Sequence, residues 1–473
     1  MQEFYQTPSV NNFKIPLDIL GGNKFGRYKK ISPQETFNMI VTDDCITNFS
    51  GHKKVLYIDE KQGRGIYSSS RLNKIILIAD NNVYSIDTNL STSLVGKLDT
   101  LQGDISIAEN LNNEIIISDG SKLYNYNYGI GSFNKLNVDF LPGYVSFQDG
   151  YFICAVKNRH EWRLSKPNDG NNFPVSGGFV GEIETKATNC IACIPFDRQL
   201  FVFGTNVCEI WKNVGNVGNS PFPYQRSGSL VIDYGCINPA TIAVGFSKIV
   251  WLASNEKSNV CIRVSEGGKS ERISTDGLDA ILSNLKNPEQ AFGFMYQIDG
   301  HVFYQITFTK DNLSYLFDFN TNKFYTLTDY DLSQHHIAKR VVFFNGSNYF
   351  ISFKDGDLYE MSSSYYDYNG NEMPTIIILN NIRKEDGQFI TCQQLNIIME
   401  QGFNKGEQAI NLSISKDGGE SFGSIYKKIL NSYGKRRNIC NFYNLGMSNE
   451  FCFKYHFLGL GRKVICSSTG YFY

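Results

Sequence analysis

Two glycine-containing stretches have residue types that could bind phosphate or a metal ion. Gly267-Gly268-Lys269-Ser270 ends like a phosphate-binding loop, but Arg263 occupies the first glycine position of that motif. Asp367-Tyr368-Asn369-Gly370-Asn371 begins like a calcium-binding loop, but Glu372 stands where the EF-hand requires glycine. Both stretches therefore predict a tight turn, and we expect no bound cofactor.

The cysteine and histidine patterns also argue against a reactive centre. Cys190 and Cys193 form a C-x-x-C pair, but a zinc site needs four ligands and no second pair lies at a suitable spacing. Two buried cysteines on a strand are the better interpretation. His335 and His336 are adjacent, so on an extended chain they point to opposite faces, and we expect loop residues. The sequence also lacks a G-x-S-x-G elbow and a zincin helix, so we expect no catalytic or metal-ligating residues and no enzyme.

A more specific motif occurs near the C-terminus. Ser415–Phe422 reads Ser-Lys-Asp-Gly-Gly-Glu-Ser-Phe and is similar to the Asp-box turn of sialidase propellers. In such a turn the carboxylate of Asp417 and backbone amides lock a hairpin at Gly418 and Gly419, and Phe422 packs beneath it. A sialidase would carry several copies and an arginine cluster for its substrate. With one copy, we expect a structural turn.

Two basic clusters follow that motif, Lys427-Lys428 and Lys435-Arg436-Arg437. They could contact phosphate groups of DNA or a neighbouring subunit, or they could form the solvated face of a hairpin. The whole chain offers no bulk attraction to nucleic acid, because 45 Lys and Arg face 46 Asp and Glu, for a net charge of −1. This balance excludes a strongly basic, histone-like binder.

The elements that must hold these motifs are almost all strands. Apolar runs alternate with turn dipeptides such as Asp119-Gly120, Asp149-Gly150 and Asp299-Gly300, which are typical of β-hairpins. Because hairpins recur at intervals of roughly 40–50 residues, they favour the radial repeats of a β-propeller over a sandwich. One helix is expected, over 278–286, where apolar residues have helical spacing.

The predicted fold is therefore all-β: a β-propeller with an N-terminal arm and a C-terminal β-sandwich-like domain. Weak periodicity marks residues 1–50 as the arm, residues 51–370 carry the hairpin repeats, and residues 371–473 follow a polar stretch that predicts a boundary. The N-terminus lacks the features of a signal peptide, and no apolar run is long enough to span a bilayer. Eleven cysteines, mostly in apolar runs, indicate synthesis in a reducing cytoplasm.

Several stretches resemble the packaged-DNA stabilisation proteins, or tail hub (nozzle) proteins, of short-tailed bacteriophages. In chain order they are Asn38-Met39 with Phe49-Ser50-Gly51, Trp162-Arg163-Leu164-Ser165 with Asn168-Asp169-Gly170, Arg198-Gln199-Leu200-Phe201-Val202-Phe203-Gly204, Cys208-Glu209-Ile210-Trp211, Pro221-Phe222-Pro223, Asp233-Tyr234-Gly235-Cys236, Ile249-Val250-Trp251-Leu252 and Arg272-Ile273-Ser274-Thr275. The Asp-box-like turn, Gly434-Lys435-Arg436 and Leu445-Gly446 resemble the closing domain of the family. Ser50 departs from the family pattern, where proline is usual.

The resemblance implies a structural virion protein of the phage tail, made in the host bacterial cytoplasm. Such proteins form a ring, usually of six copies, below the portal and its adaptor proteins. They retain packaged double-stranded DNA without reading its sequence, form its exit channel, and attach tail fibres or spikes and a needle or plug protein. The alternative function is a propeller glycosidase or glycan-binding receptor module, which would gather Arg, Asp or Glu and Tyr side chains at one propeller face.

Overall fold

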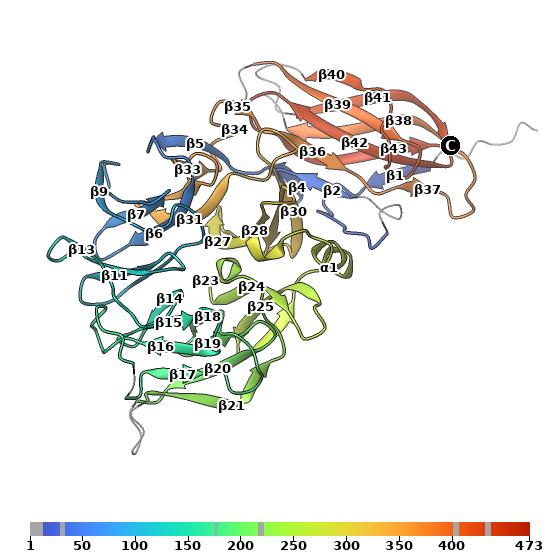
Figure 1. Ribbon diagram of the computed structural model, residues 1–473. Coiled ribbons are helices and arrows are strands. Elements are labelled where there is room, and N and C mark those ends of the chain that lie inside the picture. The colour runs from blue at the N-terminus through green and yellow to red at the C-terminus, as the bar shows by residue number, and fades with distance from the viewer. Residues whose placement is uncertain (1–12, 29–33, 176, 216–221, 401–405, 431–436) are drawn as a thin grey trace, which may run out of the picture. The chain divides into compact units, whose positions relative to one another are not determined.

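The computed structural model describes residues 13–28, 34–175, 177–215, 222–400, 406–430 and 437–473. Within these ranges nearly every regular element is a β-strand (Figure 1). The chain divides into two compact units. The propeller unit consists of residues 52–320 and 335–362, and the sandwich unit consists of residues 1–51, 321–334 and 363–473.

In the described part of the propeller unit, the strands form seven antiparallel sheets, or blades, arranged around a centre (Figure 1). The first four blades are β6–β9 (Gly63–Ser69, Lys74–Ala79, Asn82–Ile86, Thr92–Lys97), β10–β13 (Ser106–Glu109, Glu114–Ser118, Leu123–Asn127, Ser132–Lys135), β14–β17 (Pro142–Gln148, Tyr151–Val156, Glu161–Leu164, Val180–Glu182) and β18–β21 (Ala192–Phe196, Gln199–Phe203, Cys208–Asn213, Tyr224–Ile232). The fifth and sixth are β22–β26 (Gly235–Cys236, Ala243–Gly245, Lys248–Ser254, Val260–Gly267, Lys269–Arg272) and β27–β29 (Phe292–Ile298, His301–Phe308, Leu313–Asp318). The all-β propeller prediction is confirmed.

The seventh blade joins two distant parts of the sequence. Strands β31 (Ala338–Phe344), β32 (Ser347–Ser352) and β33 (Leu358–Ser362) are followed in the sheet by β5 (Gly51–Leu56). The start and the end of the propeller unit therefore pair in one sheet. Such pairing closes the ring of blades and leaves no gap in it.

The cores of the propeller lie between neighbouring blades. The second strand of each of the first four blades is a short apolar run that is buried on both faces, as in β7, β11, β15 and β19. A continuous apolar run replaces alternation because each of these strands is covered by a blade on either side. Trp162 of β16 and Trp211 of β20 pack edge to face with ring centroids 5.6 Å apart, in a core that two blades share.

Two of the predicted hairpin turns have the expected backbone. Asp149-Gly150 is the whole connection between β14 and β15, with φ of 50° and 90°. Asp299-Gly300 connects β27 and β28 in the same way, with φ of 49° and 83°. Positive φ at both central residues is the signature of the type I′ turn, which matches the twist of the strands that it joins.

Helical structure is short. Helix α1 (Asp276–Leu282) begins two residues before the predicted position and ends four residues before the predicted end, with the Thr275 side chain accepting a hydrogen bond from the Leu278 amide. Two 3₁₀ turns, η1 (Pro239–Thr241) and η2 (Pro288–Gln290), lie in loops of the propeller unit. No helix in the described ranges is long and apolar enough to cross a membrane.

The sandwich unit has two sheets and a small hairpin, and all pairs of strands in the two sheets are antiparallel except the parallel pair β2–β30. One sheet has the order β3-β4-β43-β38-β41, with β1 also paired to β43: Met39–Thr42, Cys45–Asn48, Val464–Phe472, Ile390–Glu400, Arg437–Ser448 and Phe13–Leu17. The other has the order β30-β2-β36-β42-β39-β40, with β37 also paired to β42: Lys323–Leu327, Glu35–Phe37, Thr375–Ile378, Glu450–Leu458, Gln408–Ser415, Tyr426–Leu430 and Ile382–Arg383. The hairpin is β34 (Asp367–Tyr368) with β35 (Asn371–Glu372). Residues 13–48, where we expected an arm, supply β1 to β4.

The two sheets of the sandwich unit pack through their apolar faces. From Phe453 to Leu458 the side chains of β42 alternate between buried and half-buried positions. The Tyr455 hydroxyl meets the Ser468 hydroxyl at 2.7 Å, and the Phe451 and Phe472 ring centroids lie 6.0 Å apart. Both contacts join β42 in one sheet to β43 in the other, which is the arrangement of a β-sandwich.

Candidate functional site

Asn38, which the sequence singled out, ties together three segments of the sandwich unit. It is fully buried and has a φ of 52°. Its side-chain N–H groups donate to the Thr328 hydroxyl and the Pro374 carbonyl, both at 2.8 Å. Its side-chain oxygen accepts from the Thr328 amide at 2.9 Å and the Tyr368 hydroxyl at 3.1 Å. Every hydrogen-bonding group of this side chain is used, so Asn38 has a structural role.

Gly51 is required by a close approach of two backbone segments. Its amide donates to the Tyr365 carbonyl at 2.8 Å. A Cβ at this position would lie 2.4 Å from the Asp367 carbonyl oxygen and 2.7 Å from that of Tyr365. Both distances are far below van der Waals contact, and backbone oxygens cannot rotate away. The Phe49-Ser50-Gly51 motif therefore marks a chain crossing that only glycine permits.

The Glu209-x-Trp211 motif forms a buried hydrogen-bond network in the propeller unit. Glu209 is fully buried on β20. Its Oε1 accepts from the amides of Glu184 at 2.9 Å and Thr185 at 2.6 Å and from the Thr185 hydroxyl. Its Oε2 accepts from Trp211 Nε1 at 2.9 Å. A buried carboxylate is tolerated because four donors replace water, so the motif fixes a loop and carries no visible chemistry.

Gly204 and Gly235, which belong to two of the family-like stretches, lie where two blades meet. A Cβ on Gly235 would be 2.3 Å from the Gly204 carbonyl oxygen, which accepts a hydrogen bond from the Cys236 amide at 2.9 Å. Trp251 donates its indole N–H to the Gly235 carbonyl at 3.1 Å. Phe203 packs edge to face against Trp251 at 5.3 Å. These motif residues therefore hold the blades of β18–β21 and β22–β26 together.

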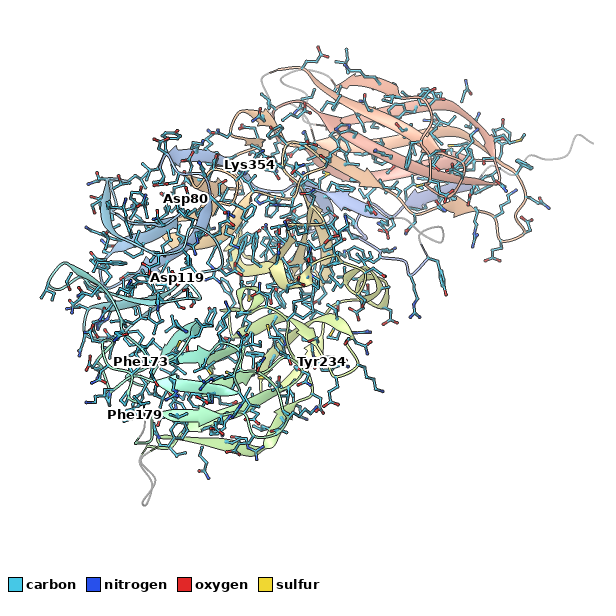
Figure 2. All side chains as sticks on the ribbon, in the orientation of Figure 1. Asp80, Asp119, Phe173, Phe179, Tyr234 and Lys354 are labelled. Atoms are coloured by element: carbon cyan, nitrogen blue, oxygen red, sulfur yellow. The ribbon has the colours of Figure 1, made fainter. Side chains whose placement is uncertain are left out.

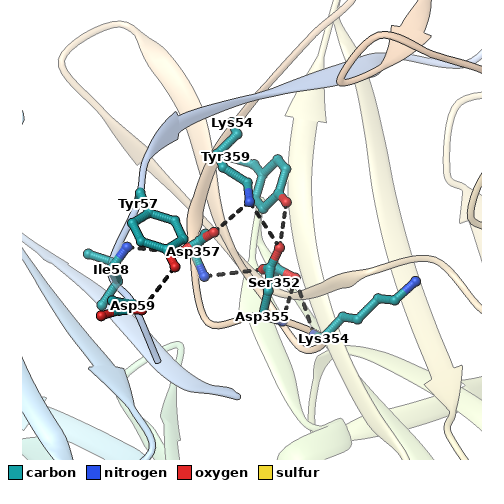
Figure 3. Close-up of polar contacts among 9 residues, drawn as sticks. All are labelled: Lys54, Tyr57, Ile58, Asp59, Ser352, Lys354, Asp355, Asp357 and Tyr359. Atoms are coloured by element: carbon teal, nitrogen blue, oxygen red, sulfur yellow. Dashed lines mark hydrogen bonds and ion pairs between the residues drawn. The ribbon is translucent and has the colours of Figure 1, made fainter. Parts of the chain in front are cut away.

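A cluster of ion pairs and hydrogen bonds stabilises the seventh blade, where the ring closes (Figure 3). No local sequence pattern predicts this cluster. Lys54 on β5 binds Asp357 at 2.6 Å and Asp355 at 3.3 Å, across the seventh blade. Asp357 also accepts from the Ile58 amide at 2.8 Å, and Asp355 accepts from the Tyr359 hydroxyl at 2.7 Å. Burial alone lowers the pKa of Lys54, but the two carboxylates outweigh burial and raise it. The ammonium therefore stays charged where the ring closes.

A polar cavity lies within the propeller unit. Its volume is about 570 Å³, and its walls come from several blades and include Asp104, Asp119, Tyr144, Lys157, Asn238 and Glu289. Figure 2 marks Asp119, whose carboxylate accepts from the Thr100 hydroxyl at 2.9 Å and from the Tyr124 hydroxyl at 3.2 Å. Asp104 is paired with Lys339 at 2.9 Å. The carboxylates of Asp104 and Asp119 are thus committed to protein partners.

Buried ionisable side chains in the propeller are held in one protonation state. His52 and His336 pack edge to face at 5.7 Å, and both are buried. Burial lowers the pKa of His336 to about 3 and lowers that of His52 well below its usual value. Cys190 and Cys193 are buried with their sulfurs 3.8 Å apart. In the described ranges no three His, Cys, Asp or Glu side chains are placed to hold a metal ion.

The Asp-box-like turn follows β39. Ser415 Oγ donates to Asp417 Oδ1 at 2.6 Å and accepts from the Gly419 amide at 2.8 Å, and the Ser421 amide donates to Asp417 Oδ1 at 3.0 Å. Hydrogen bonds from the two serines lower the pKa of Asp417. Gly418 and Gly419 have φ of 76° and 90°, and the half-buried Phe422 has Lys454 Nζ 5.4 Å from its ring centre. The local geometry is that of a locked turn.

Of the two basic clusters, only Lys427 and Lys428 can be described. Both are exposed on β40; Lys427 lies 3.9 Å from Glu407, and Lys428 lies 5.7 Å from the Phe442 ring centre. The residues Pro221, Gly434, Lys435 and Arg436 lie outside the described residues, as does the side chain of Arg437. Whether these cations contact DNA or a subunit stays a prediction.

The edge strands of the sandwich unit carry exposed apolar side chains that sequence analysis missed. Among the described residues, β40 ends one sheet and β41 ends the other, and the two strands are neighbours. Five large side chains on them are at least 41% exposed. This sandwich rim consists of Tyr426, Ile429, Ile439, Tyr443 and Met447. The sequence alone does not tell which face of a strand is covered.

Comparisons with solved structures found distant likenesses. A streptogramin B lyase structure is 11% identical, with 66% of this chain and 97% of that chain covered and a TM-score of 0.45. Virginiamycin B lyase from Staphylococcus aureus is 11% identical, covering 66% and 99%, with a TM-score of 0.46. The N-terminal domain of Nup159 is 10% identical, covering 72% and 99%, with a TM-score of 0.43. These likenesses carry no inference about function, and no curated protein matches the sequence.

A family model supplies the assignment. The model of the phage stabilisation family, described as Bacteriophage P22 Gp10, beta-propeller, matches residues 38–366, which is more than half of the chain. The match begins at Asn38 and includes both the Glu209-x-Trp211 hydrogen-bond network and the ring closure at Lys54. This chain therefore belongs to the bacteriophage P22 Gp10 family of phage stabilisation β-propellers.

Proposed function

We propose that this chain is a structural, non-catalytic protein of a phage tail that forms a ring below the portal and its adaptor proteins. The ring, of six copies, retains packaged double-stranded DNA and forms its exit channel. It also gives attachment points for tail fibres or spikes and for a needle or plug protein. The observation that carries this proposal is membership of the phage stabilisation family over residues 38–366.

The sandwich rim supports a role in assembly. Exposed apolar side chains on unpaired strand edges are a hazard in a protein that works alone, because they promote association. Ile429 is 65% exposed and Met447 is 58% exposed on adjacent edge strands. Aromatic and methionine side chains are enriched in protein interfaces. We therefore assign the subunit contacts of the proposed ring to this rim.

The charge balance supports a passive channel for DNA. Each phosphate that Lys or Arg neutralises adds affinity, so a strongly basic wall would hold the duplex in place. The net charge of −1 and the pairing of Lys54, Lys186, Lys248 and Lys339 with carboxylates leave little cationic surplus for tight binding. A chain of this kind lets DNA pass and contacts its backbone weakly.

The test is retention of DNA by particles that lack this chain. A phage with an early stop codon in this reading frame is expected to package its genome and then lose it, so particles purified by density would be empty. Supplying the wild-type chain in trans restores full particles, and supplying an Ile429→Lys variant does not. Full, stable particles without the chain would overturn the proposal.

A further inference from the structure

Two cysteines of the sandwich unit meet across paired strands. Cys45 begins β4 and Cys466 lies near the start of β43. These strands run antiparallel, with Ile46 opposite Ile465 and Thr47 opposite Val464, so the register places the two cysteines opposite each other. The two thiols are near enough that Cys466 contributes to the raised pKa of Cys45. Opposite residues on antiparallel strands have Cβ atoms about 4.5–5.5 Å apart, close to the roughly 3.5–4.5 Å of a disulfide.

The local backbone of β43 adapts to this pairing. Against its other neighbour, β38, the register shifts: Met399 is opposite Ile465, but Ile398 is opposite Ser467. Cys466 is therefore the extra residue of a β-bulge and has no partner on the β38 side. Bulges re-aim side chains and give a strand local freedom to move. The bulge thus leaves room for the small shift that a bond between the sulfurs requires.

A second pair of neighbouring cysteines in the same chain differs from this pair in its access to solvent. Cys190 and Cys193 have sulfurs 3.8 Å apart, but both side chains are buried in the core between two blades. Cys45 and Cys466 are both half-buried, so a small reagent in solvent can reach them. The two pairs differ in access, because Cys190 and Cys193 are buried and Cys45 and Cys466 are half-buried. Access is therefore the property that should decide which pair reacts.

We propose that Cys45 and Cys466 form an oxidation site, in which a low-molecular-weight disulfide such as oxidised glutathione converts the two thiols into a cross-strand disulfide. The Cys466 thiolate attacks the reagent, forms a mixed disulfide and releases one glutathione. Cys45 then loses its proton and attacks Cys466 Sγ, which releases the second glutathione. Two thiols are oxidised and one external disulfide is reduced to two thiols, so electrons and protons balance.

The consequence would be a covalent loop around the whole propeller. Residues 46–465 lie between the two cysteines, and that stretch contains the complete propeller unit. A disulfide that closes a long loop restricts the unfolded chain strongly, which favours the folded state. The inference goes beyond the proposed function, because it concerns the chemistry of the isolated chain and stands whether or not the chain forms a ring.

The proton on Cys45 sets the pH dependence of the reaction. Burial and the neighbouring Cys466 raise the pKa of Cys45 to about 11. At neutral pH Cys45 therefore stays protonated, so we expect Cys466 to be the sulfur that attacks first. Closure of the disulfide requires loss of the Cys45 proton, so the rate should rise with pH between 7 and about 9.

The test uses the reduced full-length chain, millimolar oxidised glutathione, an alkylating quench and non-reducing peptide mapping. We expect a Cys45–Cys466 linked peptide, with Cys190 and Cys193 recovered as unmodified thiols after unfolding. The Cys45→Ser variant should instead accumulate glutathione on Cys466, and oxidation of the wild-type chain should raise the thermal midpoint by about 5 °C. A Cys190–Cys193 bond formed at the same rate, a bond between two chains, or free Cys45 and Cys466 after prolonged oxidation would overturn the proposal.

Discussion

The propeller unit and the sandwich unit differ at the strands that complete or end their sheets. In the propeller, β5 completes the seventh blade, and Lys54 fastens it to Asp355 and Asp357. In the sandwich, β40 and β41 end their sheets, with Ile429 and Met447 exposed to solvent. The propeller thus joins its first and last strands within one sheet, and the edge strands of the sandwich leave apolar surface for another surface to cover. Substitutions in the first should therefore change stability, and those in the second should change assembly.

The largest effect on stability is expected at Glu209. Glu209→Ala removes the acceptor for four buried donors, so we expect a loss of about 3–5 kcal/mol in the free energy of unfolding. Urea denaturation followed by tryptophan fluorescence measures it, because Trp211 donates to this carboxylate. The matched control is Glu184→Ala, whose carboxylate pairs with Arg226 at the surface and should cost under about 1 kcal/mol. Equal losses for the two variants would contradict the claim that the buried hydrogen-bond network of Glu209 stabilises the propeller.

A somewhat smaller loss is expected at the ring closure. Lys54→Met leaves Asp357, which is 1% exposed, without its ammonium partner. We expect a loss of about 2–3 kcal/mol and earlier proteolysis next to β5. Lys53→Met is the control, because Lys53 is exposed one position earlier on the same strand. A propeller that unfolds at the same urea concentration with either variant would show that Lys54 does not fasten the ring.

The buried histidines should make the propeller sensitive to mild acid. Unfolded histidine binds a proton near pH 6.5, and His336 resists protonation until about pH 3. Between these values the unfolded state binds more protons, so stability is present above pH 6.5 and is lost as the pH falls. Each such group contributes up to about 1.4 kcal/mol per pH unit, or about 2 kcal/mol at pH 5. His336→Asn should flatten the profile between pH 6.5 and 5, and His160→Gln, a substitution at the surface, is the comparison variant.

The smallest effect on stability, with a large effect on assembly, is expected at the sandwich rim. Ile429→Lys should change the free energy of unfolding by less than about 0.5 kcal/mol, since the side chain is already exposed. The same variant should abolish ring formation in sedimentation velocity runs. Ile130→Lys, which is equally conservative for stability because Ile130 is 79% exposed in the propeller, should still form rings. If both variants or neither assembled, the contrast between the two units would fail.

Local patterns predicted the parts of this fold that local physics determines. Asp149-Gly150 specified a type I′ hairpin because few other dipeptides accept two positive φ values. The apolar runs of β7 and β15 predicted strands, and the structure buries these strands on both faces. These signals sufficed for the all-β propeller prediction.

Features that depend on contacts between residues far apart in the chain could not be predicted from the sequence. Residues 321–334 belong to the sandwich unit although they lie between two propeller segments. The Lys54–Asp357 pair joins positions about three hundred residues apart, and neither residue has a distinctive neighbourhood in sequence. The motif residues Asn38, Glu209 and Gly235 could be recognised from resemblance, but their roles as hydrogen-bond hubs and close contacts required coordinates.

The central claim, that this chain is a ring-forming component of the phage tail, is tested most directly by quantitative peptide mass spectrometry of purified particles. Isotope-labelled peptides of this chain and of the portal protein give the copy number of each per particle. The proposed function predicts a handful of copies, about six, in a constant ratio to the portal protein across preparations. Absence of the chain from particles, or a ratio that varies between preparations, would contradict it.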